Sequence, residues 1–549
     1  MAVRISGLVF LVLCSTLLGC AIIIAPSGGE KDTSPPKVLN SEPVNYSTNF
    51  IGEQVSIEFD EYVQLRDLYN NFIISPPLPA KPEIVVRGKS VVMKFDAPLP
   101  SHTTFNFNFG NSIVDIHEGN PIENYQFVIS TDSFVDSMTV QGMVIKASSL
   151  QPVKNVWVTL YDCRDYASCD SLPSKDVPKY LAKTNKEGLF RINNIQKGTY
   201  KIFALIDKNR NYLFDLPNES IGFIGNLIEA GDSSLLRLSI FDQEDGNQKV
   251  TKVWTIEPGL SKIAFKLPVD ELEISAIDFS SKTRWEVVEY SANRDTIEYW
   301  NTSGMDSLKL HIRDRRYSFE DTVSVGLGHK KELSKLTLST NVSRTKVLDI
   351  GKTLQVLTSK PLTIYDEQNI KLLERIDSVT LSEVEFKTSY ADETRKTLNL
   401  AHDWKPGTTY RLKLEPEALT DLFGGKSDSL AVDFSVGKEE YYGKVAVEIT
   451  FPEIEHAFIV QLLNARGGVS RENFIQLERS SQNLTRKLDY QHVTPGKYRL
   501  KVVYDMNSNR RWDTGNHAEN RQPERIAFSK DDILIRANWD QVLDWTLDP

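Results

Sequence analysis

The sequence predicts an all-β protein made of several β-sandwich domains. Short runs with apolar residues at every second position recur along the chain, as in Val55–Phe59, Val91–Phe95 and Phe105–Phe109. Such runs indicate strands with one buried face, and turn-forming residues separate them. Helical periodicity is almost absent. A chain of 549 residues exceeds the size of a single core, so we expect several sandwiches in an elongated chain.

The N-terminal residues predict export and attachment to a lipid. Arg4 precedes the apolar run Gly7–Leu18, which is shorter than the roughly 20 residues that span a bilayer. The run ends in Leu17-Leu18-Gly19-Cys20, which resembles the bacterial lipobox. The resemblance implies that residues 1–19 are a signal peptide and that Cys20 carries the acyl chains. The alternative is an ordinary signal peptide that happens to contain two cysteines.

Residues 20–36 are predicted to form a lipidated tether. Gly and Pro punctuate this segment and no periodicity is present. Ala21 stands where inner-membrane lipoproteins of enteric bacteria carry Asp, which favours the outer membrane.

Two cysteines remain after Cys14 leaves with the signal peptide and Cys20 takes a lipid. Cys163 and Cys169 are expected to form a local disulfide in an oxidising cell envelope. The alternative is a thiol metal site or a redox pair. Five intervening residues, with no His or second cysteine pair nearby, speak against that alternative.

The charge balance excludes some classes of partner. Removing Arg4 with the signal peptide leaves 63 basic against 74 acidic residues, a formal net charge of −11. An acidic chain without a basic block is not expected to bind nucleic acid or an anionic lipid surface.

An internal repeat organises the chain. Lys197–Asp207 and Pro495–Asp505 share a Gly two positions before a Tyr and nine before an Asp. Each copy continues as Asp-x-Asn-x-Asn-x-x-x-Asp and then reaches Glu-x-Ile-x-Phe. The preceding strands repeat as well: Leu99–Phe109 corresponds to Trp404–Leu414. The predicted domains are residues 37–135, 136–245, 246–339, 340–437 and 438–549.

These segments resemble two known families. Ile74-Ser-Pro-Pro, the Thr-Thr-Phe strand and the turn Glu118-Gly-Asn-Pro are similar to the bacterial Ig-like domain of the surface-layer (SbsA) type. The lipobox with its Pro-Ser-Gly-Gly-Glu-Lys-Asp tail resembles Ig-like-domain lipoproteins of Bacteroidota. Segments such as Val156-Trp-Val-Thr-Leu and Gly198-Thr-Tyr are similar to transthyretin-like, or carboxypeptidase-regulatory-like, sandwiches. The resemblance implies tandem Ig-like and transthyretin-like β-sandwiches, with an Ig-like middle domain. Such modules typically serve as spacers, scaffolds and docking surfaces.

The two Asp-Asn loops are the candidate sites. Oxygen side chains at alternate positions can surround Ca²⁺, as in the first half of an EF-hand loop. These loops lack its Gly at position six, where Tyr212 and Arg510 stand, and its Glu at position twelve, where Asn218 and Asn516 stand. The alternative, an Asx-turn network that ties down a hairpin tip, is favoured over calcium. The candidate residues are Asp207, Asn209, Asn211, Asp215, Asp505, Asn507, Asn509 and Asp513.

The sequence predicts a non-enzymatic protein that needs no cofactor, apart from a possible calcium ion. It contains no Gly-x-Ser-x-Gly elbow, phosphate loop, His-Glu-x-x-His or dinucleotide fingerprint. Catalysis by carboxylates that are dispersed in the sequence and form no short motif stays an open alternative. The first hypothesis is a scaffold that docks on an outer-membrane β-barrel machine for assembly or export. The second is a surface-exposed, glycan-binding or adhesin-like lipoprotein. Family resemblance favours the cell surface over the periplasmic face.

Overall fold

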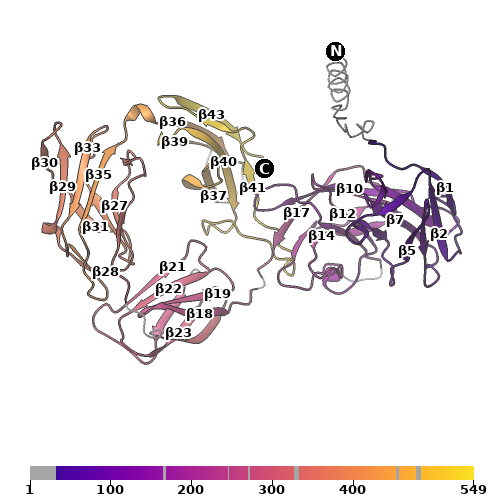
Figure 1. The fold of residues 1–549 in the computed structure, drawn as a ribbon, viewed down its shortest axis with the longest axis horizontal. Helices are drawn as coiled ribbons and strands as arrows, with labels where there is room; N and C mark the ends of the chain where they lie inside the picture. The colour runs from indigo at the N-terminus through magenta and orange to yellow at the C-terminus, as the bar shows by residue number, and fades with distance from the viewer. Residues whose placement is uncertain are drawn as a thin grey trace, which may run out of the picture. The chain divides into compact units, whose positions relative to one another are not determined.

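Nearly every regular element of the protein is a β-strand (Figure 1). The computed structural model describes residues 32–164, 169–244, 246–269, 272–326, 333–452, 457–477 and 484–548. The predicted all-β, multidomain fold is confirmed. Among the described residues the helical elements are short: α2 (Leu68–Asn71), η1 (Leu172–Ser174), η2 (Glu367–Asn369) and η3 (Glu439–Tyr441). None of the described helices combines the length and the apolar character that crossing a membrane requires.

Residue contacts divide the chain into two compact units. The first holds the described chain up to Val144, together with Pro152–Phe214 and Ile224–Leu238. The second holds Ile145–Gln151, Asp215–Phe223 and the chain from Ser239 onward.

The first sandwich consists of the sheets β1-β2-β6-β5 and β4-β7-β9 and the pair β3-β8. The strands predicted from period-two runs correspond to β2, β6 and β7, whose inward side chains fill the core with phenylalanines. Strand bounds are β1 Val38–Glu42, β2 Gln54–Phe59, β3 Val63–Leu65, β4 Ile73–Ser75, β5 Glu83–Arg87, β6 Ser90–Lys94, β7 Thr104–Gly110, β8 Ile113–Asp115 and β9 Tyr125–Ser130.

The second sandwich is built on a sheet of order β12-β11-β14-β15-β17-β10-β13, with β16 paired to β14. Its buried side chains include Leu160, Tyr200 and Ile202. Strand bounds are β10 Met138–Lys146, β11 Trp157–Asp162, β12 Tyr180–Lys183, β13 Leu189–Ile195, β14 Thr199–Ile206, β15 Ser220–Phe223, β16 Ile228–Glu229 and β17 Leu236–Asp242.

Polar side chains join these two sandwiches within the first unit. The outward side of β7 carries Asn106, whose Nδ2 donates to Asn194 Oδ1 at 3.1 Å. The backbone N–H of Leu181 donates to Ser75 Oγ at 3.1 Å. Asn106 and Ser75 are buried although they face away from the first core. Their burial shows that the second sandwich covers this face.

The middle segment forms a third sandwich, with the sheets β18-β19-β22-β21 and β20-β23-β24. Its core contains Ile263, Tyr299 and Leu310. Strand bounds are β18 Val250–Glu257, β19 Leu260–Phe265, β20 Leu272–Ala276, β21 Glu286–Tyr290, β22 Thr296–Asn301, β23 Ser307–Asp314 and β24 Phe319–Gly326.

The fourth sandwich repeats the arrangement of the first, with the sheets β25-β27-β32-β31 and β26-β35-β33-β29-β30 and the pair β28-β34. The boundary predicted between residues 339 and 340 cuts β25, which pairs with β27. Because Leu336 also packs in this core, the domain starts earlier than predicted. Strand bounds are β25 Leu338–Thr340, β26 Val347–Leu348, β27 Leu354–Thr358, β28 Leu362–Tyr365, β29 Ile370–Arg375, β30 Leu381–Glu383, β31 Lys387–Tyr390, β32 Thr397–Ala401, β33 Thr409–Leu414, β34 Leu419–Asp421 and β35 Leu430–Val436.

The fifth sandwich closes the described chain, with the sheets β39-β36-β43 and β38-β37-β40-β41, and with β42 paired to β40. Its core lies between the inward faces of β36 and β40. Strand bounds are β36 Gly443–Thr450, β37 Ala457–Asn464, β38 Val469–Gln476, β39 Thr485–Val493, β40 Gly496–Asp505, β41 Ile526–Phe528, β42 Ile533–Ile535 and β43 Asp540–Thr546.

Candidate functional site: repeated loops and turns

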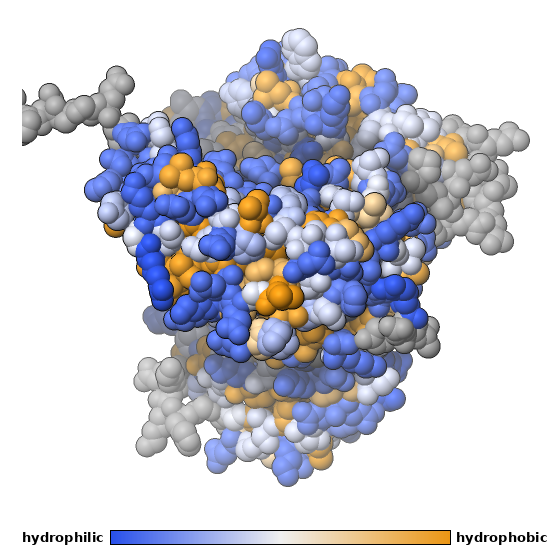
Figure 2. All heavy atoms as spheres, turned by 90° about the vertical axis from the view of Figure 1, so that its right-hand side faces the viewer, coloured by the Kyte–Doolittle hydropathy of each residue, from blue (hydrophilic) through white to orange (hydrophobic). Residues whose placement is uncertain are grey.

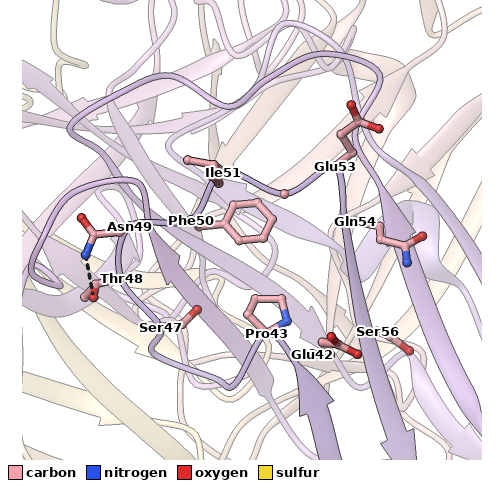
Figure 3. Close-up of a pocket in the computed structure, with 11 residues that line it drawn as sticks. Glu42, Pro43, Ser47, Thr48, Asn49, Phe50, Ile51, Glu53, Gln54 and Ser56 are labelled. Atoms are coloured by element: carbon pink, nitrogen blue, oxygen red, sulfur yellow. Dashed lines mark hydrogen bonds between the residues drawn. The ribbon is translucent and has the colours of Figure 1, made fainter.

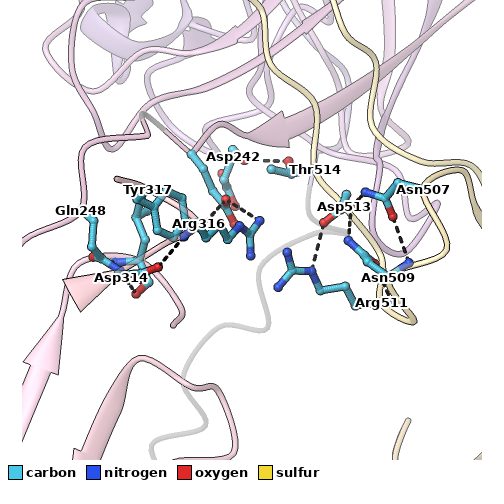
Figure 4. A network of polar contacts seen from close by, with 12 residues as sticks. Asp242, Gln248, Asp314, Arg316, Tyr317, Asn507, Asn509, Arg511, Asp513 and Thr514 are labelled. Carbon is cyan, nitrogen blue, oxygen red and sulfur yellow. Dashed lines mark hydrogen bonds and ion pairs between the residues drawn. The ribbon is translucent and has the colours of Figure 1, made fainter. Parts of the chain in front are cut away.

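The second Asp-Asn loop is held by carboxylates that accept hydrogen bonds from the loop itself, and Figure 4 shows those that Asp513 accepts. Asp505, at the end of β40, is fully buried. Its carboxylate accepts the backbone N–H of Asn509 at 3.0 Å and of Arg510 at 2.7 Å. Asp513 Oδ2 accepts the side-chain amides of Asn507 and Asn509, each at 2.6 Å. These contacts are those of an Asx-turn network.

The first Asp-Asn loop is organised in a similar way, and in both loops the leading aspartate accepts the N–H of the residue five positions on. The carboxylate of Asp207 accepts the backbone N–H of Arg210 and, at 2.8 Å, that of Tyr212. Asn211 Oδ1 accepts the N–H of Leu213 at 2.8 Å. Both loops therefore organise their backbone around the leading aspartate.

The residue at the sixth loop position adopts the conformation that glycine favours. Tyr212 and Arg510 each have φ of 64°. The Tyr212 ring lies 5.1 Å from that of Trp157, and the Arg510 guanidinium lies 4.7 Å from the Phe474 ring. A side chain that packs on a ring offsets the cost of this backbone conformation. The missing glycine therefore does not prevent the turn.

Sequence reasoning missed the residue that closes each loop. Glu219 Oε2 accepts the N–H of Asp215 at 3.0 Å, and Glu524 Oε2 accepts that of Asp513 at 2.9 Å. Both glutamates are buried. The signal was present, because each opens the repeated Glu-x-Ile-x-Phe motif.

Burial raises the pKa of Glu524, and the neighbouring carboxylates of Asp513 and Asp505 raise it further. Backbone N–H groups oppose this rise but do not cancel it. Carboxylate oxygens of Asp505, Asp513 and Glu524 therefore accept hydrogen bonds from donors of the protein itself.

Within the described part of the chain, no three His, Cys, Asp or Glu side chains are grouped so that they could hold a metal ion. Calcium binding, which the sequence favours less than an Asx-turn network, stays an untested alternative for these loops.

The remaining predicted site residues are three cysteines. Cys163 and Cys169 are bonded to each other, with 5.8 Å between their Cα atoms, in the segment that follows β11. Cys20 lies outside the described residues.

The second loop carries an insertion that contacts another sandwich. Four positions separate Asp215 from Glu219, whereas eleven separate Asp513 from Glu524. Within the second unit, the insertion reaches the ends of β15 and β17. Its contacts are Thr514 Oγ1 to the Asp242 carbonyl at 2.8 Å, the His517 N–H to Gln243 Oε1 at 2.7 Å, and Gln522 Nε2 to the Phe223 carbonyl at 2.9 Å.

A second repeated feature is an aspartate-centred turn in the first sandwich and in the fourth. The carboxylate of Asp115 accepts the backbone N–H groups of His117, Glu118, Gly119 and Asn120 at 2.5–3.0 Å. Burial raises the pKa of Asp115, but these four donors outweigh burial and hold the pKa at about 2. In the fourth sandwich, Asp421 accepts the N–H groups of Phe423 and Gly425 in the same way.

The turn at Asp421 lies in an interface with the middle sandwich. Leu422 packs in a buried cluster with Leu260, Val287 and Trp300, and the Phe423 ring lies 6.3 Å from that of Trp300.

Lys360 adds a buried charge to this interface. Its side chain is 2% exposed, and its Nζ lies 3.9 Å from Glu257 and 3.9 Å from Asp421. Its ammonium also donates to the Ser334 carbonyl. One lysine thus contacts the middle sandwich, the connecting segment and the turn.

The first sandwich also contains an open pocket of about 390 Å³ (Figure 3). The Phe50 ring and Pro43 face each other across it, and Glu42, Glu53 and Gln54 supply polar walls. An aromatic face beside carboxylate and amide groups is suited to a polyhydroxylated ligand.

Comparison with protein families identifies the first sandwich. Residues 32–131 match the family model described as bacterial Ig-like domain. This segment is a bacterial Ig-like domain. No curated protein matches the sequence.

Solved structures with similar folds include multidomain chains. The S-layer protein rSbsC(31-844) is 11% identical over 86% of this chain and 65% of that chain, with a TM-score of 0.13. This chain therefore spans less than two thirds of the S-layer chain. The major pilin subunit BcpA of Bacillus cereus is 10% identical over 75% of this chain and 99% of that chain, with a TM-score of 0.13. The four N-terminal Ig domains of Dscam1 isoform 9.44 are 9% identical over 77% and 94%, with a TM-score of 0.16. These likenesses concern the fold alone.

Proposed function

We propose that the protein is a non-catalytic outer-membrane lipoprotein, anchored through Cys20, that serves as a scaffold subunit of an outer-membrane protein complex. A β-barrel machine for assembly or export is the partner that fits best, and the cell surface is the favoured face. The basis for the anchor is the lipobox-like sequence Leu17–Cys20. Several acyl chains give stable attachment, since each buried methylene contributes about 0.8 kcal/mol.

The observation that carries the scaffold proposal is the way in which the sandwiches contact each other. Buried polar groups join them: Asn106 contacts Asn194 in the first unit, and Lys360 contacts Glu257 in the second. A buried polar group tolerates few geometries, because any displacement leaves it without a partner. Such joints keep neighbouring domains in a defined geometry, as a subunit that positions other proteins requires.

Co-purification tests the scaffold proposal. The full chain, isolated from detergent-solubilised membranes, should retain a stoichiometric outer-membrane β-barrel protein. Its absence under mild detergent conditions would contradict the scaffold function.

The anchor is tested separately with Cys20→Ala. This variant should lose acylation and leave the membrane fraction, because acylation at Cys20 is the only proposed attachment. Persistence in the outer membrane after a high-salt wash would show that the anchor assignment is wrong or that partner docking alone holds the protein.

Glycan binding is a second candidate function, which the pocket at Phe50 and Pro43 favours. A glycan array probed with the full chain should then give signals that Gln54→Ala reduces. Gln461→Ala, a polar change in the fifth sandwich, is the control and should leave such signals unchanged.

A further inference from the structure

The two Ig-like turns occupy equivalent positions in their sandwiches. The N–H of Ile116 donates to the Tyr62 carbonyl at 3.2 Å, and the N–H of Leu422 donates to the Pro361 carbonyl at 2.8 Å. The flanking pairs also correspond, since Val63 faces Asp115 in β3-β8 and Leu362 faces Asp421 in β28-β34. The surface around the Asp115 turn can therefore be compared residue by residue with the surface around the Asp421 turn.

In the fourth sandwich this surface is covered. Leu422 is 7% exposed, and Lys360, counted as a whole residue, is 1% exposed. The middle sandwich approaches so closely that a Cβ added at Gly259 would lie 2.4 Å from the Phe423 ring. The surface at the Asp421 turn is thus a docking surface, and its occupant presents a tryptophan and a glutamate.

In the first sandwich the equivalent side chains are exposed and apolar. Tyr62 is 57% exposed and Ile116 is 50% exposed. Figure 2 faces the side on which β1, β2 and β5 lie in Figure 1, and there apolar residues gather among hydrophilic ones.

The charge at this surface is the reverse of that in the fourth sandwich. Glu61 directly precedes Tyr62, as Lys360 precedes Pro361. Burial raises the pKa of Glu61, and the nearby carboxylates of Asp115, Asp60, Asp32 and Glu118 raise it further. The nearness of these carboxylates gives the surface its acidic character. Lys89 borders it, with Nζ 5.7 Å from the centroid of the Tyr62 ring, and donates to the Asp60 carbonyl.

We propose that Tyr62, Ile116 and Glu61 form a docking surface for a partner protein that presents an apolar side chain beside a lysine or arginine. This inference rests on the scaffold function and names the surface that serves it. The covered surface of the fourth sandwich provides the precedent. There Lys360 pairs with a glutamate of its occupant, so Glu61 at the equivalent position calls for an occupant with a positive charge. A second copy of the chain that offered its middle sandwich would place Glu257 against Glu61. Like charges in contact disfavour that pairing.

Site-specific photo-cross-linking in the full chain tests this surface. With p-benzoylphenylalanine at position 62, membranes of the producing cell should yield an adduct with one protein, joined within a few residues of a lysine or arginine. Glu61→Lys should lower the adduct yield about tenfold, because it places like charges together. Replacing the partner's basic residue by glutamate should restore the yield with Glu61→Lys. The control position is Tyr46, a tyrosine of the same domain that is 55% exposed, and it should give no such adduct.

Other outcomes overturn the docking surface. These are the absence of an adduct, an adduct with lipid or with a second copy, and a yield that Glu61→Lys does not change. If a β-barrel protein still co-purifies in any of these cases, the scaffold function stands and only the docking surface is wrong. If nothing co-purifies with the unaltered chain, the scaffold function itself fails.

Discussion

The two copies of the repeated pair of sandwiches, the first with the second and the fourth with the fifth, use the same turns for different contacts. In the first copy, the Asp115 turn leaves Ile116 exposed, and the Asp207 loop is short. In the second copy, the Asp421 turn is buried under the middle sandwich, and the Asp505 loop carries an insertion that reaches β15 and β17. A few local changes, Lys360 in place of Glu61 and seven extra loop residues, convert local turns into domain contacts.

The largest difference between the copies is expected at Lys360. Lys360→Ala leaves Glu257 and Asp421 without their buried cation, which should destabilise the second unit by about 3 kcal/mol. The equivalent change, Glu61→Ala, should be close to neutral because the Glu61 carboxylate lies among like charges. Hydrogen exchange of the full chain measures both, at the turns following β34 and β8. Equal effects would show that the two surfaces do not differ as described.

The leading aspartates of the two loops should differ by a smaller amount. Asp505→Ala removes a fully buried carboxylate that accepts the N–H groups of Asn509 and Arg510, and it should cost about 2 kcal/mol. Asp207 is only half-buried, so water can replace its carboxylate in Asp207→Ala, and the cost should be about 1 kcal/mol. Local hydrogen exchange across each loop gives the two values. A larger loss in the first loop would contradict this ranking.

The insertion contact can be broken with one methyl group. A Cβ at Gly515 would lie 2.5 Å from the Phe241 ring, so Gly515→Ala should destabilise the contact by about 1–2 kcal/mol. Faster exchange should then appear both in Thr514–Gln522 and at the end of β17. Gly225→Ala is the matched control, since no atom lies within 4 Å of its added Cβ. If exchange rises only in the insertion, the two segments are not coupled.

Acid should weaken the first turn through Asp115. Its folded pKa of about 2 lies below that of an unfolded aspartate, about 3.9, so the ionised form stabilises the fold. This contribution is complete above about pH 4 and disappears as the pH falls towards 2. Exchange of residues 115–120 should rise over that range, and Asp115→Asn should remove the pH dependence. If hydrogen exchange of this turn keeps the same pH dependence in Asp115→Asn, Asp115 is not the group whose titration weakens the turn.

Calcium should have no measurable effect if both loops are Asx-turn networks. The thermal unfolding temperature of the full chain should be the same in chelator and in millimolar calcium. Asp505→Ala should lower it equally in both conditions. An increase of several degrees with calcium, lost in Asp505→Ala, would establish a metal site by mass action.

Patterns in the sequence were sufficient to predict the all-β fold, the strands β2, β6 and β7, and the equivalence of the two Asp-Asn loops. Period-two alternation and repeated turn residues are local signals, and each reports on one strand or one loop. The leading position of Asp505 in its loop and the short separation of Cys163 from Cys169 can likewise be read from the sequence, because the residues involved lie close together in the chain.

Which surfaces of the sandwiches meet could not be predicted from the sequence and is known from the three-dimensional structure. The burial of Lys360 depends on Glu257, more than a hundred residues away, and the contact of Thr514 with Asp242 joins two different sandwiches. The predicted boundary between residues 339 and 340 was wrong because it cuts β25. This strand has three residues and is defined by its pairing with β27, which the local sequence does not indicate. Contacts between distant segments depend on the whole fold, and no local pattern encodes them.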